Sequence, residues 1–124
     1  MTMKLCLIVD DSRVVRKVAR RIAEDLGLEC EECEDGEKAY NFCQTRMPDA
    51  VILDWNMPIM SGLEFLEKLR QMDGGDKPRV IFCTTENDVK YIARAIQAGA
   101  NEYIMKPFDS GIIESKFKQV GLIE

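Results

Sequence analysis

The sequence contains the run Val51-Ile52-Leu53-Asp54-Trp55-Asn56-Met57-Pro58, in which a short apolar segment is followed by an aspartate and a Met-Pro turn. The apolar residues 50–53 predict a buried β-strand. Because burying an unpaired charge is costly, Asp54 at the end of such a strand must face a cleft or meet a cation. The simpler alternative is an aspartate that only caps the following turn.

Length and composition indicate one cytoplasmic domain over residues 1–124. Hydrophobic residues make up 46% of the chain and charged residues 31%, as in ordinary soluble domains. The net charge of −5 argues against a nucleic-acid-binding surface, because phosphate contacts need clustered Lys and Arg. The longest apolar run, residues 5–9, is too short to cross a bilayer, and the N-terminus lacks the pattern of a signal peptide. We therefore expect no direct nucleic-acid contact and no membrane insertion.

The chain has five cysteines and no histidine. The odd cysteine count and the apolar surroundings predict buried, reduced thiols. Cys30 and Cys33 have the spacing of a redox motif, but residues three apart in a strand point to opposite faces. Without histidine, any reaction that needs a general base must use another group.

Five predicted strands alternate with five predicted helices. The strands are expected at 4–9, 30–34, 50–53, 79–83 and 102–105. The helices are expected after Ser12 up to Gly27, over 37–46, from Ser61 to Gly74, between Asn87 and Gly99, and from Asp109 or Ser110 onward. This alternation is typical of an α/β fold with helices on both faces of a parallel sheet.

Apolar stripes indicate which helix faces pack on the sheet. In the first helix the stripe consists of Val14, Val15, Val18, Ala19, Ile22, Ala23 and Leu26, and in the fourth helix of Val89, Ile92, Ala93 and Ile96. The opposite face of the first helix is basic and carries Arg13, Arg16, Lys17, Arg20 and Arg21. Such a face is either solvated or a docking surface for an acidic partner.

Polar residues follow four of the predicted strands at their carboxyl ends. They are Asp10, Asp11, Asp54, Thr84 and Lys106. Each one has a simpler explanation when taken alone, such as helix capping or a lysine lying along the surface. In open α/β sheets, however, ligands bind outside the carboxyl ends of the strands. We therefore expect all of these side chains to meet in one crevice.

The chemistry of that crevice favours phosphoryl transfer. Three carboxylates repel each other unless a cation joins them. The available ligands are oxygens, apart from the thiol of Cys83, which favours Mg²⁺ over zinc. Asp54 would then act as the nucleophile, while Mg²⁺ and Lys106 offset the charge of the transferring group. Thr84 would donate a hydrogen bond to a phosphoryl oxygen.

These motifs resemble those of response-regulator receiver domains, over essentially the whole chain. The matching residues are Val9-Asp10-Asp11-Ser12, Leu53-Asp54-Trp55-Asn56-Met57-Pro58 with Gly62, Thr84, and Lys106-Pro107-Phe108. The resemblance implies a flavodoxin-like, doubly wound, five-stranded parallel sheet in the order 2-1-3-4-5, with five helices in three αβα layers. It also implies a signalling switch of a two-component system, similar to the single-domain chemotaxis regulators. Such a protein catalyses only its own phosphorylation and dephosphorylation.

The resemblance also implies a role for individual residues. Asp54 resembles the aspartate that accepts a phosphoryl group from a sensor histidine kinase or a histidine phosphotransfer protein. Asp11, Asp54 and the backbone carbonyl of Asn56 resemble the Mg²⁺ ligands, with Asp10 acting through water. Lys106 resembles the lysine that contacts the phosphoryl oxygens.

Three further features are implied in the same way. Thr84 and Tyr103 occupy the positions of the switch pair, in which the hydroxyl moves toward the phosphoryl group and the ring turns inward. Asn56 and Glu86 occupy positions that modulate dephosphorylation. The bond between Lys106 and Pro107 is expected to be cis.

The implied output surface consists of the fourth helix, fifth strand and fifth helix, which would bind a downstream protein. Its expected residues are Lys90, Tyr91, Arg94, Gln97, Tyr103 and 114–118. We expect a monomer, with a dimer on phosphorylation as the alternative. The chain is either a stand-alone switch or the receiver portion of a longer regulator with a DNA-binding or enzymatic output domain.

Two readings from other classes are less compatible with the residues. A flavodoxin-like electron carrier needs a phosphate-binding loop after the first strand, where this chain has acids that would repel a phosphate. An aspartyl-phosphate phosphatase needs a substrate-covering cap, for which the chain is too short.

Overall fold

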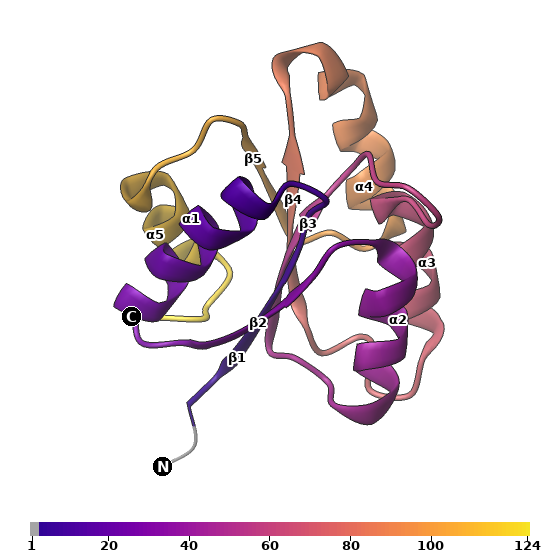
Figure 1. Ribbon diagram of the computed structural model, residues 1–124, viewed down its shortest axis with the longest axis horizontal. Helices are drawn as coiled ribbons and strands as arrows, with labels where there is room; N and C mark the ends of the chain where they lie inside the picture. The colour runs from indigo at the N-terminus through magenta and orange to yellow at the C-terminus, as the bar shows by residue number, and fades with distance from the viewer. Residues whose placement is uncertain (1–2) are drawn as a thin grey trace.

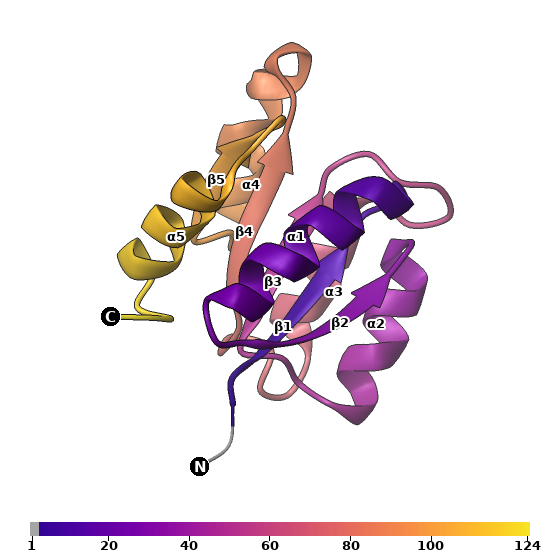
Figure 2. The same ribbon diagram turned by 60° about the vertical axis from the view of Figure 1, so that its left-hand side comes forward.

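The computed structural model describes residues 3–124, except for the side chains of Glu86 and Asn87. Its centre is one parallel sheet with the strand order β2-β1-β3-β4-β5. The strands are β1 (Leu5–Val9), β2 (Glu29–Cys33), β3 (Ala50–Asp54), β4 (Arg79–Thr84) and β5 (Glu102–Met105). The edges of the sheet are β2 and β5 (Figure 2). The predicted fold class and strand order are confirmed.

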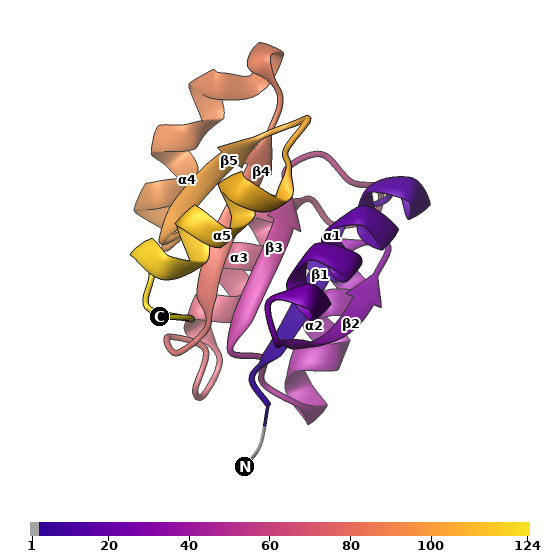
Figure 3. The same cartoon turned by 90° about the vertical axis from the view of Figure 1, so that its left-hand side faces the viewer.

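Helices cover both faces of the sheet. They are α1 (Arg13–Asp25), α2 (Gly36–Thr45), α3 (Gly62–Gln71), α4 (Ile92–Ala98) and α5 (Ser110–Gln119), with a short 3₁₀-helix, η1 (Glu86–Tyr91), before α4. Figure 1 shows α1 and α5 on one side and α2, α3 and α4 on the other, and Figure 3 looks onto the α1–α5 side. No helix within residues 3–124 has both the length and the apolar composition that a bilayer crossing requires.

Polar caps determine where four of the helices begin. The side chains of Ser12, Asp35, Ser61 and Asp109 each accept a hydrogen bond from the backbone N–H three residues further on. Such a bond satisfies one of the amide groups that the first helical turn leaves without a partner. The helix α4 is terminated by Gly99, which adopts a φ of +116°, a conformation that favours glycine. The caps predicted at Ser12 and Ser61 are confirmed, and of the two residues predicted to begin the last helix, Asp109 is the cap.

Alternate residues of the central strands build two separate cores. Leu7 and Val9 pack with α2, α3 and α4, whereas Cys6 and Ile8 pack with α1 and α5. Cys30 and Cys33 lie in different cores, so their predicted opposite orientation is confirmed. All five cysteines are free and buried, as predicted.

The apolar stripes of two helices differ from the prediction. In α1, Val14 and Val18 are 73% and 46% exposed, because they lie at the edge of the stripe beside the loop between β5 and α5. In the fourth helical region, Val89 and Ile96 are 46% and 44% exposed.

The second difference has a geometric cause. The segment expected to be a regular helix begins as η1, whose three residues per turn shift the faces that follow. Ala93 is exposed as well, and Ala95 is the residue of α4 that is fully buried. The inward face of α4 is therefore centred on Ala95, and not between Ile92 and Ile96 as the stripe predicted.

Candidate functional site

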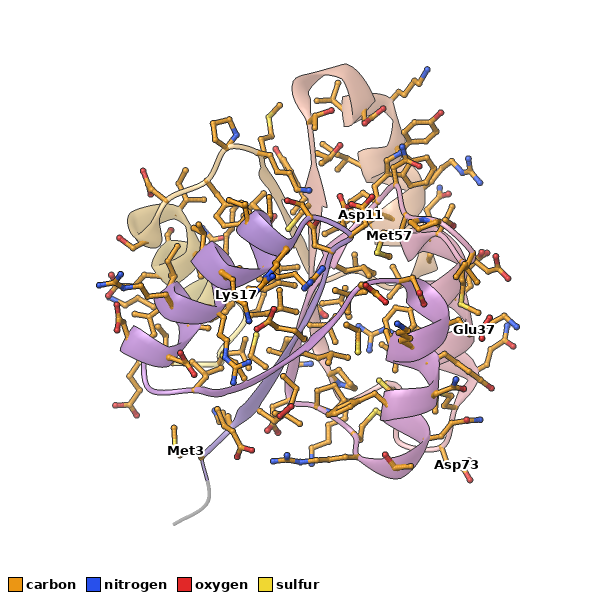
Figure 4. All side chains as sticks on the ribbon, in the orientation of Figure 1. Met3, Asp11, Lys17, Glu37, Met57 and Asp73 are labelled. Carbon is orange, nitrogen blue, oxygen red and sulfur yellow. The ribbon has the colours of Figure 1, made fainter. Side chains whose placement is uncertain are left out.

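Three acids meet at the carboxyl end of the sheet. Asp10 and Asp11 follow β1, and Asp54 ends the adjacent strand β3. One oxygen of each carboxylate lies within 4.8 Å of the others. Asp10 and Asp54 are buried, whereas Asp11 is exposed on the solvent side of the cluster, at the end of the sheet away from Met3 and Asp73 (Figure 4).

Lys106 brings a positive charge to this cluster from the loop after β5. Its Nζ lies 2.7 Å from Oδ2 of Asp10 and 3.0 Å from Oδ1 of Asp54. Its backbone N–H donates to the carbonyl of Thr84 at 2.8 Å, which continues the pairing of β4 and β5 beyond their ends. The Lys106–Pro107 bond is cis, as expected. One ammonium group therefore contacts two buried carboxylates.

Lys106 alone does not neutralise the negative charge of the cluster. Burial, together with the charge of Asp10, raises the pKa of Asp54 from 3.8 to about 6, although the hydrogen bond from Lys106 acts in the opposite direction. Burial disfavours the charged form of Lys106, but its hydrogen bonds to Asp10 and Asp54 outweigh this effect and raise its pKa. A second cation would relieve the remaining repulsion between the carboxylates.

The donor set suits a hard divalent cation. The cluster offers three carboxylates, two of them on buried residues, and the chain contains no histidine. Burial raises the pKa of the Cys83 thiol, so this neighbour stays protonated and is a poor ligand. Oxygen ligands that leave room for water are those that Mg²⁺ prefers. The residues present therefore fit Mg²⁺.

Among the described residues, the hydrogen bond to the Asp54 side chain comes from Lys106, and the remaining predicted residues do not share it. Thr84 is buried, and its hydroxyl donates to the carbonyl of Thr85 at 3.3 Å. Tyr103 is exposed on the edge strand β5, with Nζ of Lys116 5.2 Å from its ring centroid. Asn56 is exposed in the loop after β3. The side chain of Glu86 lies outside the described part of the chain.

Two features of the loop after Asp54 were missed by the sequence interpretation. The ring of Trp55 stacks on that of Tyr91, with centroids 3.9 Å apart and planes inclined by 20°. Ile59 has a φ of +69° and is 75% exposed, in a γ-turn closed by a 2.7 Å hydrogen bond from the Met60 N–H to the Pro58 carbonyl. The only sequence signal for the stack was the aromatic residue next to Asp54. Nothing in the sequence indicated the positive φ of Ile59, because β-branched residues avoid that conformation.

Sequence comparison assigns the family. Residues 6–118 match the sequence profile described as the response regulator receiver domain. The chain belongs to this family. This receiver domain is 34% identical over 115 residues to "Chemotaxis protein CheY-3" of Vibrio cholerae, which covers 92% of this chain and 88% of the relative. It is 36% identical over 121 residues to "Chemotaxis protein CheY homolog" of Campylobacter jejuni, and this match covers 95% of this chain and 92% of the relative.

Solved structures agree with the assignment. The chemotaxis protein CheY4 of Vibrio cholerae, crystallised at pH 4.0, superposes on this receiver domain with a TM-score of 0.89. The two are 29% identical, and the match covers 96% of this chain and 99% of the other. A putative response regulator from Chloroflexus aurantiacus gives a TM-score of 0.90 at 26% identity, and the match covers 96% of this chain and 98% of the other.

Proposed function

We propose that this receiver domain is a cytoplasmic phosphorylation switch of a two-component system, with Asp54 as the phosphoryl acceptor. The observation that carries the proposal is the position of Asp54. Its carboxylate is buried at the end of the central strand β3, 3.0 Å from Nζ of Lys106, and clusters with two further acids. The donor would be a sensor histidine kinase or a histidine phosphotransfer protein.

The transfer step follows from this arrangement. A carboxylate oxygen of Asp54 attacks the phosphorus of a phosphohistidine, the nitrogen–phosphorus bond breaks, and the released imidazole takes up a proton. Lys106 binds one phosphoryl oxygen through Nζ. The Thr84 hydroxyl turns away from the Thr85 carbonyl and donates to another oxygen. The product is an aspartyl phosphate on Asp54.

Mg²⁺ would neutralise charge on the phosphoryl group when it is bound. Asp11, Asp54 and the backbone carbonyl of Asn56 would hold the ion, and Asp10 would act through water. In this role Asp10 also holds Lys106 in place, through the 2.7 Å contact between the two side chains. Asn56 and Glu86 would modulate the return reaction with water, so that the chain catalyses only changes in its own phosphorylation.

The readout would be binding of a downstream protein to the surface formed by α4, β5 and α5. Tyr103 is exposed on this surface, so its ring is not fixed in the core, and it would turn inward when the Thr84 hydroxyl moves. The named relatives are chemotaxis proteins, which favours a switch that acts by protein contact. A longer regulator with a separate output domain is the second candidate, because receiver domains also match parts of larger chains such as NtrX.

Incubation with acetyl phosphate and Mg²⁺ is expected to add the mass of one phosphoryl group, as measured by intact-mass spectrometry. The gain should be absent without Mg²⁺ and absent in Asp54→Asn. Asp73→Asn is the matched control, because Asp73 is exposed at the other end of the sheet (Figure 4), and it should be phosphorylated like the wild type. A gain that persists in Asp54→Asn, or no gain in the wild type, would contradict the proposal.

We infer that the phosphoryl donor docks at the surface beside Lys106. Val14, Val15 and Val18 of α1 form a groove of about 450 Å³ with Lys106, Pro107 and Phe108. The basic face of α1 is less available, because Arg16, Lys17 and Arg20 bind Glu32 at 3.1, 2.9 and 2.9 Å. Although burial of Glu32 opposes ionisation, these bonds lower its pKa to about 2. An apolar face of the donor is therefore the better match than an acidic one.

Val18→Ser is expected to slow phosphotransfer from the protein donor about threefold to tenfold, because the exposed valine loses its apolar contact with the donor. Arg20→Glu should slow the same transfer less, since Arg20 is already paired with Glu32. Both variants should react with acetyl phosphate at the wild-type rate, as followed by intact mass. A larger loss in Arg20→Glu than in Val18→Ser would favour the acidic-partner interpretation instead.

A further inference from the structure

The tryptophan that follows Asp54 connects the acceptor site to the fourth helical region. The chain has one tryptophan, Trp55, and its ring contacts two aromatic neighbours. It forms a T-shaped pair with Phe82 in β4, with centroids 6.3 Å apart and planes at 62°. It also stacks on Tyr91, with centroids 3.9 Å apart. Because Phe82 is fully buried in the sheet, the indole is held by the core and Tyr91 is its movable partner.

Tyr91 lies at the junction of η1 and α4. It is the last residue of η1 and directly precedes Ile92, the first residue of α4. The segment around it is thinly anchored, since Ala95 is the one fully buried residue of α4, while Val89 and Ile96 are exposed. The hydrogen bonds of a 3₁₀-helix are also poorer than those of an α-helix. The aromatic stack of Tyr91 on Trp55 is therefore one of the contacts that hold this segment in place.

Both rings are connected to the acceptor site by short stretches of chain. Trp55 adjoins Asp54, and its carbonyl accepts a 3.0 Å hydrogen bond from the N–H of Gly62, which fixes it to the start of α3. On the other side, η1 begins two residues after Thr84, whose hydroxyl here donates to the Thr85 carbonyl. A phosphoryl group that attracts the Thr84 hydroxyl would therefore displace Thr85 and η1, while Trp55 stays in place.

We propose that the stack of Trp55 on Tyr91 is a latch that stabilises the unphosphorylated position of η1 and α4. This inference rests on the proposed function and specifies how its output is controlled. A contact that is made in one state and lost in the other shifts the population toward the first. Phosphorylation of Asp54 must open the latch. By linkage, removing the latch favours both the displaced position of α4 and phosphorylation itself.

Tyr91→Leu tests the latch, with Tyr40→Leu as its matched control. Tyr40 lies on α2 and, like Tyr91, is half-buried. Each ring also has a lysine nearby: Nζ of Lys68 lies 5.5 Å from the Tyr40 centroid, and Nζ of Lys90 lies 5.3 Å from the Tyr91 centroid. The measurement is amide hydrogen exchange of residues 86–98, before and after phosphorylation with acetyl phosphate and Mg²⁺. Trp55 fluorescence, from the chain's one tryptophan, reports the stack directly.

In the wild type, phosphorylation is expected to speed exchange of residues 86–98 about threefold to tenfold, the range that corresponds to losing one aromatic pair. Unphosphorylated Tyr91→Leu should already exchange at the faster rate and show altered Trp55 emission. Tyr40→Leu should behave as the wild type does in this segment. Tyr91→Phe, which keeps a stacking ring, should also retain the slow exchange.

The outcomes separate the latch from the proposed function. If intact mass shows phosphorylated Asp54 but residues 86–98 exchange equally in both states, the latch is wrong and the function stands. The same holds if Tyr91→Leu exchanges like the wild type. If Asp54 is not phosphorylated at all, intact mass shows this independently, and the proposed function fails together with the latch.

Discussion

Gly62→Ala is expected to lower the free energy of unfolding by about 3 kcal/mol, at the upper end of the usual cost of overpacking. A Cβ atom on residue 62 would lie 2.0 Å from the carbonyl oxygen of Asp54 and 3.0 Å from its carbonyl carbon. Both are backbone atoms, so the clash is relieved only if the end of β3 separates from the start of α3. Urea unfolding followed by circular dichroism measures the loss.

The displacement should also impair the acceptor site, because the moving backbone carries Asp54. We expect Mg²⁺-dependent phosphorylation of folded Gly62→Ala to be slower than in the wild type. Gly111→Ala is the control for the substitution itself. Its Cβ would lie 3.4 Å from Oδ1 of Asp109, within α5, where alanine should stabilise the helix by about 0.5 to 1 kcal/mol. Wild-type stability of Gly62→Ala would show that β3 and α3 are not packed this closely.

Asp54→Asn is expected to stabilise the metal-free protein at pH 7.5, by up to about 3 kcal/mol. Burial and the charge of Asp10 raise the pKa of Asp54 from 3.8 to about 6, which means that folding disfavours the ionised form. A difference of about two pKa units corresponds to this upper value at roughly 1.4 kcal/mol per unit. Asparagine has nearly the same shape and no charge. Chemical denaturation in the presence of a chelator measures the gain.

The pH dependence gives an independent check with a defined sign. The stability contributed by protonated Asp54 is fully present below its unfolded pKa of 3.8 and is lost as the pH rises through about 6. Glu32 acts in the opposite sense. Its pKa is lowered from 4.5 to about 2, so its contribution is present above pH 4.5 and is lost as the pH falls toward 2.

Metal-free wild type should therefore become more stable between pH 7 and about pH 5 and less stable below about pH 4. Asp54→Asn should lack the rise and keep the fall. Addition of Mg²⁺ at pH 7.5 should stabilise the wild type and leave Asp54→Asn nearly unchanged, because only the folded wild type binds the ion. A wild-type stability that is flat between pH 7 and 5 would refute the repulsion on which this prediction depends.

The sheet and its cluster of acids could be predicted because their signals are local. Short apolar runs define β1, β3 and β4, and Asp10, Asp54 and Lys106 lie at or just after the strand ends. Because the strands are parallel, these side chains had to lie at the same end of the sheet, at the carboxyl ends of the strands. The geometry adds that Lys106 bonds Asp10 as well as Asp54, which no spacing in the sequence indicates.

The features that were missed depend on contacts between distant segments. The inward face of α4 is set by the 3₁₀ turn before it, and the stack of Trp55 on Tyr91 joins the loop after β3 to the end of η1. Arg70 is a further case. Its guanidinium donates to the carbonyls of Gly75, Pro78 and Gly99 and to the side chain of Asn101. An arginine in the last turn of α3 predicts a solvated charge, whereas here it fastens α3 to the ends of two loops.

The burial of every cysteine makes this receiver domain a convenient substrate for site-directed labelling. Burial raises the pKa of Cys33 to about 11 and that of Cys43 to about 12, so almost no reactive thiolate forms in the folded state. The neighbouring Cys6 thiol lowers the pKa of Cys30, but that residue is 2% exposed. A cysteine introduced on α4 could therefore carry a fluorophore or spin label without removal of the native ones, and alkylation of the native thiols would report how often the whole sheet opens.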